Sequence, residues 1–427
     1  MIYLKNRTQN KINESPNIMD INEIGIRQKF LTSKMSHSKK VSSFLTFIIA
    51  LLILMSYYPW PVWSIGPWNM RIVSVLSVSI SFYYFRIKNI KQNFFIAFFY
   101  LITVFYIFFG GKSGYKVPTH VELSIFLLLL CLPKELYILV LLKFERIITF
   151  IFIFGISIYI ISYFLKLPSF NIPPLNPSKL GNYQVRIFDL QLIDYTVYNT
   201  RKFMSIFDEP GVIGTFLALL ISYRKINLNK LRDVILIVGG LLSFSLAFYI
   251  VFFINLIYNK TFNIKFYLIF FIIFGVFYFF KPAFINEVLF DRFIIGESIS
   301  VVDNRTTEDF DLKYKEFVNK GGSSLILGLG PNSITDLSKE IDLNISSYKS
   351  TVYRIGIIGV ALIIIFYFLS TLKITNSIRG WFFFLVFIML GWQRPGVLDY
   401  YNIFIFFGAL NYISLNNNFQ RQIKSYK

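Results

Sequence analysis

The chain has 427 residues, of which 55% are hydrophobic and 19% aromatic, while only 15% are charged. Its mean hydropathy is +0.58, a value that excludes an ordinary water-soluble domain. The formal net charge is +20. Most basic residues stand in short segments beside apolar runs, where Lys and Arg orient helices and contact anionic lipid. The composition therefore predicts a polytopic membrane protein that does not bind nucleic acid.

The first forty residues, 1–40, are polar and carry more Lys and Arg than Asp and Glu. This segment lacks the apolar core of a cleavable signal peptide, so we expect it to form a cytoplasmic tail. Residues 41–415 are predicted to form one transmembrane domain, and residues 416–427 a second cytoplasmic tail.

Apolar runs of helical length recur along the transmembrane domain and indicate an all-α membrane fold. Several are shorter than the roughly 20 residues of a full span, so tilt or local thinning of the bilayer must compensate. The predicted spans are Val41–Tyr58, Ile72–Phe85, Phe94–Phe109, Val121–Leu132, Ile147–Leu165, Gly211–Tyr223, Phe266–Phe280, Val352–Leu372, Trp381–Trp392 and Tyr401–Leu415.

One further apolar stretch, Val234–Tyr258, has basic residues at both ends, Arg232 and Lys260. Because basic residues mark the cytoplasmic side, the stretch should enter and leave on the same side. We therefore predict two short helices hinged near Ser243–Ser245, with the hinge shielded by protein or facing water. A single crossing is the alternative. With the hairpin, the chain has about twelve transmembrane helices and both termini are cytoplasmic.

Basic segments between the apolar runs set the predicted orientation. The segments "RIKNIKQN", "KFER", "RKINLNKLRD", "NKTFNIK" and "KITNSIR" are all expected on the cytoplasmic side. Two long segments, 166–210 and 281–351, then become external loops. Since loops held by a rigid scaffold often carry function, we look for a site there.

The first external loop ends in "RKFMSIFDEPGVIG", which joins charged residues to an apolar helix. Pro210 and Gly211 are typical of a helix start, and Asp208 and Glu209 lie at its positive dipole end. Capping alone explains an acidic residue and the proline, but it does not explain Arg201. A guanidinium beside carboxylates at a membrane surface suits a diphosphate-linked substrate, with an acid as base for a hydroxyl.

The second external loop repeats this pattern. Arg305 opens a polar segment expected to be helical, and "GLGPNS" ends it in a turn. The next span begins in "SSYKSTVYRIGIIG", with Tyr348 and Arg354 at its outer end and with Gly356 and Gly359 expected to allow close helix packing. An interfacial anchor is the alternative role for Arg354.

Other motifs support no site. "GGKSG" at Gly110–Gly114 lacks the first glycine of a phosphate-binding loop, since position 106 is Tyr106. The acidic pair in Asp309–Asp311 could hold a divalent ion, but mixed charges are typical of a solvated helix face. One Cys and two His residues cannot form a Cys or His zinc centre. We therefore expect neither a metal nor a cofactor.

These residues resemble the superfamily of O-antigen polymerases and O-antigen ligases, which are membrane glycosyltransferases of the GT-C type. The resemblance rests on Arg201 followed by "FDEPGVIG", on Arg305 followed by "GLGPNS", and on "SSYKSTVYRIGIIG". It covers roughly Arg201 to Gly359. It implies a donor glycan carried on undecaprenyl diphosphate and an active site on the periplasmic side of the bacterial inner membrane.

The resemblance also implies roles for single residues. Arg201 and Arg305 match the positions that hold the diphosphate, and Arg186 is a third candidate. Glu209 or Asp208 is the expected base, and the site would also include Tyr348 and Arg354 as substrate-binding residues.

One position separates the two branches of the superfamily. Ligases carry a His shortly before the tyrosine, and here that position is Ile345, which favours a polymerase. Its expected partners are the lipid-linked oligosaccharide, the bilayer and a chain-length regulator protein. A ligase and a lipid-linked oligosaccharide flippase are the alternatives, and a structural scaffold is a third.

Overall fold

The computed structural model describes residues 39–55, 57, 59–62, 98, 102–103, 106, 134–172, 183–186, 188–192, 202–207, 209–259, 293–295, 299–301, 307–330, 332–337, 347–393 and 400–425. The predicted spans Ile72–Phe85, Val121–Leu132 and Phe266–Phe280, and most of Phe94–Phe109, lie outside these residues. The chain divides into two units, residues 1–45 and 46–427. The first is described only in the opening turns of α2, so the following concerns the second.

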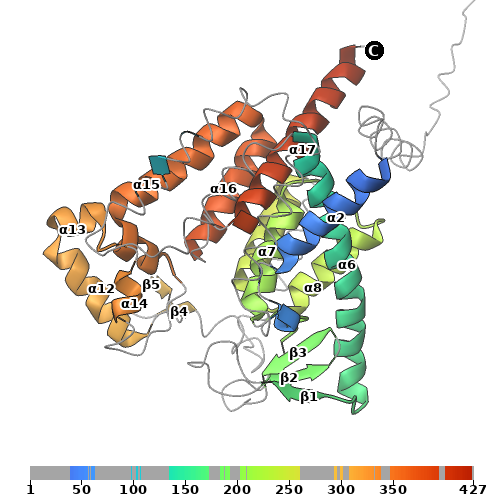
Figure 1. Cartoon of the computed structure of the whole chain (residues 1–427), viewed down its shortest axis with the longest axis horizontal. Coiled ribbons are helices and arrows are strands. Elements are labelled where there is room, and N and C mark those ends of the chain that lie inside the picture. The colour runs from blue at the N-terminus through green and yellow to red at the C-terminus, as the bar shows by residue number, and fades with distance from the viewer. Residues whose placement is uncertain are drawn as a thin grey trace, which may run out of the picture. The chain divides into compact units, whose positions relative to one another are not determined.

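The described residues are mostly helical (Figure 1), because long apolar runs with few glycines and prolines satisfy their backbone hydrogen bonds locally. The helices are α2 (Lys39–Met55), the short 3-10 helix η1 (Trp60–Val62), α6 (Lys134–Phe164), α7 (Pro210–Ser222), α8 (Leu231–Leu242), α9 (Leu246–Tyr258), α12 (Glu308–Lys320), α13 (Gly322–Leu327), α14 (Ser333–Leu337), α15 (Tyr348–Ile374), α16 (Ile378–Gln393) and α17 (Tyr400–Ser425).

Helix α6 begins earlier than the sequence predicts. It starts at Lys134 instead of Ile147, so "KFER" lies inside the helix, and its prediction as a loop is wrong. The added turns are apolar and bury Leu136 and Leu141 completely. The charge of Glu145 does not interrupt the helix, because partners from other segments satisfy its carboxylate.

The predicted break in Val234–Tyr258 is confirmed. Helix α8 ends at Leu242 and α9 begins at Leu246, with Phe244 at a φ of 49° between them. The hinge is shielded by protein, since Ser243 is 1% and Ser245 4% exposed. The Ser243 hydroxyl donates to the carbonyl of Gly240 at 2.7 Å, so the break leaves this polar group satisfied.

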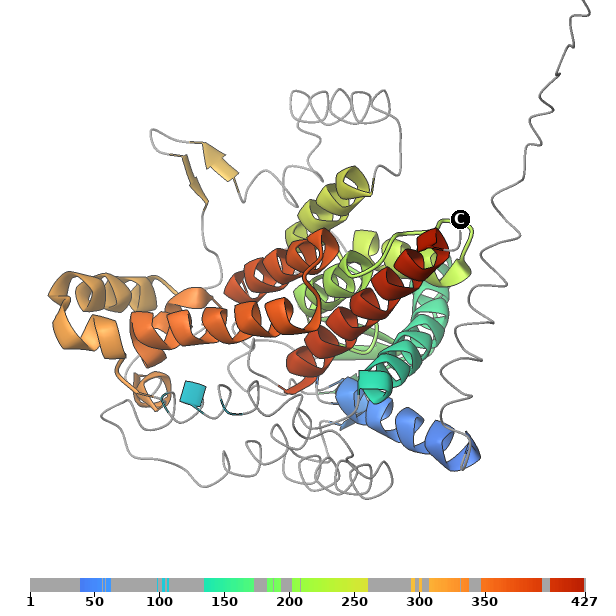
Figure 2. The same ribbon diagram turned by 90° about the horizontal axis from the view of Figure 1, so that it is seen from above.

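Helices α15, α16 and α17 lie side by side (Figures 1 and 2). Their shared core is aromatic: the Tyr367 ring of α15 lies 4.7 Å from Phe387 of α16 and 4.6 Å from Phe406 of α17. Helix α17 also packs along α6, where Tyr137 contacts Phe404 at 5.1 Å. Aromatic rings packed in this way stabilise the contacts between the helices. They bury a large apolar area, and their tilted and edge-to-face orientations are favourable.

Large apolar side chains are also exposed on α6, α9, α15 and α16. Exposed examples are Phe150, Phe154, Ile160, Ile161, Ile250, Ile254, Ile257, Ile357, Ile358, Ile365, Phe368, Leu372, Leu385 and Met389. Such extended apolar surface is unusual for a protein in water. Within the described residues, Tyr348–Ile374 is the one helix long and apolar enough to cross a bilayer, and the shorter apolar helices include Pro210–Ser222, Leu246–Tyr258 and Ile378–Trp392.

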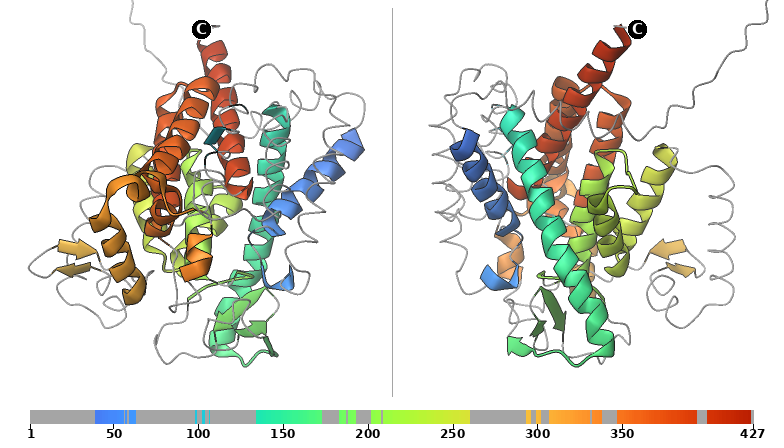
Figure 3. Two further views of the ribbon diagram at one scale, coloured as in Figure 1. Left: turned by 60° about the vertical axis from the view of Figure 1, so that its left-hand side comes forward. Right: turned by 90° about the vertical axis from the view of Figure 1, so that its right-hand side faces the viewer.

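Short strands occur in both long loops, and the sequence analysis did not predict them. Strands β1 (Phe170–Ile172), β2 (Tyr183–Arg186) and β3 (Asp189–Leu192) form an antiparallel sheet in the order β1-β2-β3. Figure 3 shows this sheet at the C-terminal end of α6. Strands β4 (Phe293–Ile295) and β5 (Ile299–Val301) pair as an antiparallel hairpin.

Candidate functional site

The segment before α7, residues 202–207, is mostly buried, although it belongs to a loop expected to face solvent. Phe203 and Phe207 are fully buried, and Ser205 adopts a φ of 50°. The Phe203 amide donates to the carbonyl of Leu242 at 3.0 Å, and the Leu190 amide donates to that of Ser205 at 2.7 Å. The segment is therefore fixed between the end of α8 and the sheet.

One glycine allows this segment to approach α6 closely, and a second allows α7 to approach the hinge between α8 and α9. A Cβ at Gly155 of α6 would lie 2.9 Å from the carbonyl oxygen of Phe188 and 3.0 Å from the hydroxyl of Ser205. A Cβ at Gly214 of α7 would overlap the side chain of Ser245. The first external loop is thus packed against the ends of helices and holds the start of α7 in place.

Helix α7 begins where the sequence predicts. Pro210 is its first residue, and Glu209 occupies the N-cap position with extended backbone angles. The Glu209 side chain makes no capping hydrogen bond, and its carboxylate lies at the positive end of the helix dipole. Arg201 and Asp208, the other predicted site residues of this approach, lie outside the described residues.

Arg186 lies on β2 and is partly covered. Its guanidinium lies 3.5 Å from the carboxylate of the buried Asp189 and donates to the Gln184 amide oxygen at 2.8 Å. Asp189 already balances the positive charge. This pairing weakens the case for Arg186 as a diphosphate ligand, because a bound anion would compete with a desolvated carboxylate.

The two motifs of the second loop meet directly. In the "GLGPNS" turn, the amide of Leu329 donates to the carbonyl of Tyr353, and that of Gly330 to the carbonyl of Arg354, both at 2.9 Å. These carbonyls lie just before a break in α15 at Gly356, whose φ is 67° and ψ −176°. The turn thus supplies donors to carbonyl groups at the end of a helical segment.

Glycine is required on both sides of this contact. A Cβ at Gly356 would overlap the carbonyl oxygen of Ile326, and one at Gly328 would overlap that of Arg354. Gly356 therefore lies against the end of α13 and the turn that follows it. At Gly359, the nearest atoms to a Cβ belong to Ile355 of the same helix, and the expected helix packing there stays a prediction.

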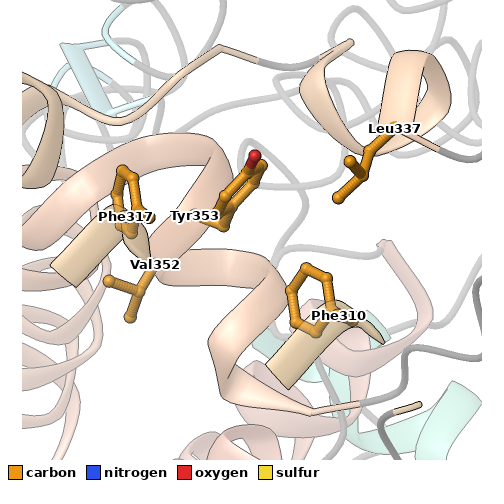
Figure 4. Packing of buried hydrophobic residues seen from close by; sticks show 5 residues of the cluster. All are labelled: Phe310, Phe317, Leu337, Val352 and Tyr353. Carbon is orange, nitrogen blue, oxygen red and sulfur yellow. The ribbon is translucent and has the colours of Figure 1, made fainter. Parts of the chain in front are cut away.

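Helix α12 is the predicted helical segment after Arg305, and it packs on the first turns of α15. Figure 4 shows the apolar cluster that joins them, made of Phe310, Phe317, Leu337, Val352 and Tyr353. The Tyr353 ring lies 4.9 Å from Phe317 and 5.8 Å from Phe310. Helices α12–α14 are thereby fixed to the segment of α15 before Gly356. Arg305 itself lies outside the described residues.

Tyr348 and Arg354 both lie on this first segment of α15. Tyr348 stacks on Trp392 at the end of α16, with centroids 4.5 Å apart and an interplanar angle of 12°. Arg354 is exposed. An apolar groove between the two helices begins at this stack and is lined by Tyr348, Thr351, Val360, Ile363, Ile364, Ile388, Gly391 and Trp392.

The residue after Tyr348 forms an ion pair that the sequence analysis did not predict. Lys349 lies 2.8 Å from the Asp311 carboxylate of α12. Asp311 belongs to the acidic pair weighed above as a metal ligand, and no group of three or more His, Cys, Asp and Glu in the described residues could hold a metal. The pair places one negative and one positive charge beside the aromatic stack.

A second polar cluster lies at the opposite end of α7. The buried Glu145 carboxylate accepts hydrogen bonds from Tyr223 at 2.6 Å and Arg232 at 2.9 Å, and lies 3.2 Å from Arg224. Arg224 also donates to Asp233 at 2.6 Å. Burial alone would lower the pKa of Arg224, but Glu145, Tyr223 and Asp233 outweigh it, so the pKa is raised above its ordinary value.

Arg379, at the start of α16, joins this cluster through neutral acceptors. It donates to the carbonyl of Tyr223 at 3.1 Å and to the Asn259 amide oxygen at 2.5 Å, and lies over the Tyr258 ring. Burial lowers the pKa of its guanidinium to about 10. Residues from "KFER", "RKINLNKLRD", "NKTFNIK" and "KITNSIR" thus meet in one polar cluster.

Comparisons of the chain with protein-family profiles, curated proteins and solved structures find no match.

Proposed function

We propose that the protein is a membrane glycosyltransferase that joins undecaprenyl-diphosphate-linked oligosaccharide repeat units into O antigen or a related surface polysaccharide. One observation carries this proposal: the two motifs of the resemblance, "GLGPNS" and "SSYKSTVYRIGIIG", are in backbone contact. Distant segments that share a resemblance and also meet in space are expected of one functional site.

A polytopic membrane fold of about twelve spans is part of the proposal. It is supported by the apolar outer faces of α6, α9, α15 and α16, and by the hinge between α8 and α9, which the charge pattern required. The stack of Tyr348 on Trp392 suits a membrane interface, where aromatic residues are enriched. The site would face the periplasm, and the cluster around Glu145 would lie at the cytoplasmic end.

The chemistry requires positioning and charge stabilisation. A hydroxyl of the acceptor sugar attacks the anomeric carbon of the donor, and a new C–O bond forms. The bond from that carbon to the diphosphate breaks, and the hydroxyl proton passes to a base. Arg201 and Arg305 would stabilise the departing diphosphate, a contribution of several kcal/mol. Because the leaving group is already good, the reaction needs no nucleotide.

Two alternatives remain distinct hypotheses. A ligase would move finished polysaccharide to another acceptor, and the residue at position 345, Ile345, argues against it. A flippase would have to open its substrate cavity alternately to the cytoplasm and to the periplasm. The buried ion pairs of Glu145 with Arg224 and Arg232 join three segments at the proposed cytoplasmic end, so opening there would separate buried charges at high cost. This favours an enzyme over a flippase.

Deletion of the gene, followed by gel analysis of surface glycan, separates these functions. A polymerase predicts products with a single repeat unit, whereas a ligase predicts long unattached chains. A flippase predicts repeat units that stay on the cytoplasmic leaflet. Unchanged surface glycan would reject all three.

We expect Arg305→Ala and Arg201→Ala to abolish the glycan ladder, because each removes a guanidinium that stabilises the departing diphosphate. Expression of each variant in the deletion strain and gel analysis of the glycan measure this. Lys315→Ala is the control, since Lys315 is an exposed cation of α12. Wild-type chain lengths in Arg305→Ala would contradict the assigned role.

Glu209→Gln tests the proposed base. If this carboxylate accepts the hydroxyl proton, the amide should slow chain growth by about 10²-fold or more, while the level of protein in the membrane stays unchanged. Full polymer formation by Glu209→Gln would exclude Glu209 and leave Asp208 as the candidate.

A further inference from the structure

The outer end of α15 carries aromatic and charged side chains from three helices. Tyr348 stacks on Trp392, and Trp392 is 45% exposed. Lys349, the neighbour of Tyr348, is paired with Asp311 of α12. Tyr314 stands three residues after Asp311, on the same side of α12. We call Asp311, Tyr314, Tyr348, Lys349 and Trp392 the α12–α15 cluster.

Two of these residues share one apolar core. Tyr314 and Tyr348 both pack against the apolar cluster of Phe310 and Tyr353. Burial, followed by the nearby Tyr348, raises the pKa of the Tyr314 phenol, so this phenol remains a protonated donor at neutral pH. The Lys349 and Asp311 side chains keep exposed fractions of 16% and 33%, so solvent reaches both.

The charge of the cluster indicates the class of ligand. Its one cation is already neutralised by a carboxylate 2.8 Å away, and that carboxylate would repel a phosphate. An uncharged polyol, such as a sugar, would not be repelled by this carboxylate. Carboxylates accept hydrogen bonds from hydroxyl groups, ammonium and phenol groups donate to them, and an aromatic face packs against the apolar C–H face of a sugar ring.

We propose that the α12–α15 cluster binds the acceptor sugar of the repeat unit, with Asp311 accepting from its hydroxyl groups. This rests on the proposed function. The reaction brings together two glycans, and the reacting sugar of the donor is bonded to a diphosphate, so its surroundings must be cationic. The reacting sugar of the acceptor is remote from its own diphosphate. A net-neutral cluster with aromatic faces therefore suits the acceptor.

An anchoring role in the membrane interface would also explain Tyr348 and Trp392. Membrane anchoring does not require the carboxylate of Asp311. The ion pair is partly exposed, and such pairs add little to stability, so Asp311→Asn should fold. Glu316→Gln is a matched control, because Glu316 lies on the same helix and pairs with the exposed Lys313 at 3.5 Å.

The test uses full-length protein in lipid nanodiscs, with lipid-linked repeat units extracted from the deletion strain as substrate. Two competitors are compared: the free repeat-unit oligosaccharide, which lacks the diphosphate, and inorganic pyrophosphate. We expect Asp311→Asn to weaken inhibition by the oligosaccharide about 10- to 100-fold, the effect of one lost charge-assisted hydrogen bond. Inhibition by pyrophosphate should not change, and Glu316→Gln should match the wild type for both.

Unchanged inhibition by the oligosaccharide in Asp311→Asn would overturn the inference, as would an equal loss of inhibition by pyrophosphate. A second readout, oligosaccharide binding followed by tryptophan fluorescence, does not depend on turnover. There, Asp311→Asn should weaken binding by the same factor, and Trp392→Leu should abolish the fluorescence change if Trp392 reports the bound sugar. If wild-type protein binds the oligosaccharide but makes no polymer, the proposed function fails while the sugar-binding cluster stands.

Discussion

We expect Gly356→Ala to cause a large loss of stability, comparable among the described glycines to that of Gly328→Ala, where a Cβ would overlap the carbonyl oxygen of Arg354. Ala would have to hold a φ of 67°, which costs about 1–2 kcal/mol. Its Cβ would also overlap the carbonyl oxygen of Ile326, a backbone atom that cannot rotate away. The total should exceed about 3 kcal/mol. Thermal unfolding of purified protein in detergent measures it.

Gly322→Ala is the matched control for this variant. Gly322 has a similar φ of 63°, but nothing lies within 4 Å of a Cβ there. It should therefore lose only about 1 kcal/mol, from backbone strain alone. If both variants melt at the same temperature, the close contact between the turn and α15 does not hold the site together.

We expect Glu145→Gln to cause the second large loss of stability. Glu145 is fully buried and compensates two guanidinium groups, those of Arg224 and Arg232. The amide keeps the shape of the side chain but removes the charge, which leaves the buried Arg224 and the partly exposed Arg232 to share the carboxylate of Asp233. The expected cost is about 3–5 kcal/mol. The same thermal unfolding measurement applies.

Glu316→Gln again provides the comparison. The side chains of Glu316 and Lys313 are 58% and 44% exposed, and surface pairs of this kind contribute about 0–1 kcal/mol. Equal melting temperatures for Glu145→Gln and Glu316→Gln would show that the buried cluster does not hold the helices together.

Charge and hydropathy patterns predicted some elements well. The start of α7 at Pro210 and the break at Ser243–Ser245 both follow from local rules, since proline favours a helix start and basic residues at both ends of an apolar stretch require its return. These signals depend on neighbouring residues. They do not require knowledge of the tertiary contacts.

Other features depend on contacts between distant segments. The continuation of α6 through "KFER" requires Arg224 and Arg232 to compensate Glu145, and no local pattern identifies those partners. The pairing of Asp311 with Lys349 is of the same kind. The acidic pair in α12 and the lysine after Tyr348 were visible in the sequence, but their proximity arises from the apolar packing of α12 on α15.

The glycines show a mixed result. Gly356 was predicted to permit a close approach, and it does, but its partner is the end of α13 and the turn that follows it. The left-handed angle could not be predicted, because "GIIG" in an apolar run is equally typical of helix packing. The prediction would have needed the knowledge that "GLGPNS" lies against it.

The most direct test of the account is reconstitution. Purified wild-type protein in nanodiscs is mixed with lipid-linked repeat units from the deletion strain, without nucleotide, and the products are resolved on a gel. We expect a ladder of increasing chain length with release of undecaprenyl diphosphate, and no ladder with Arg305→Ala. Single repeat units alone with the wild type, or a ladder that persists in Arg305→Ala, would contradict it.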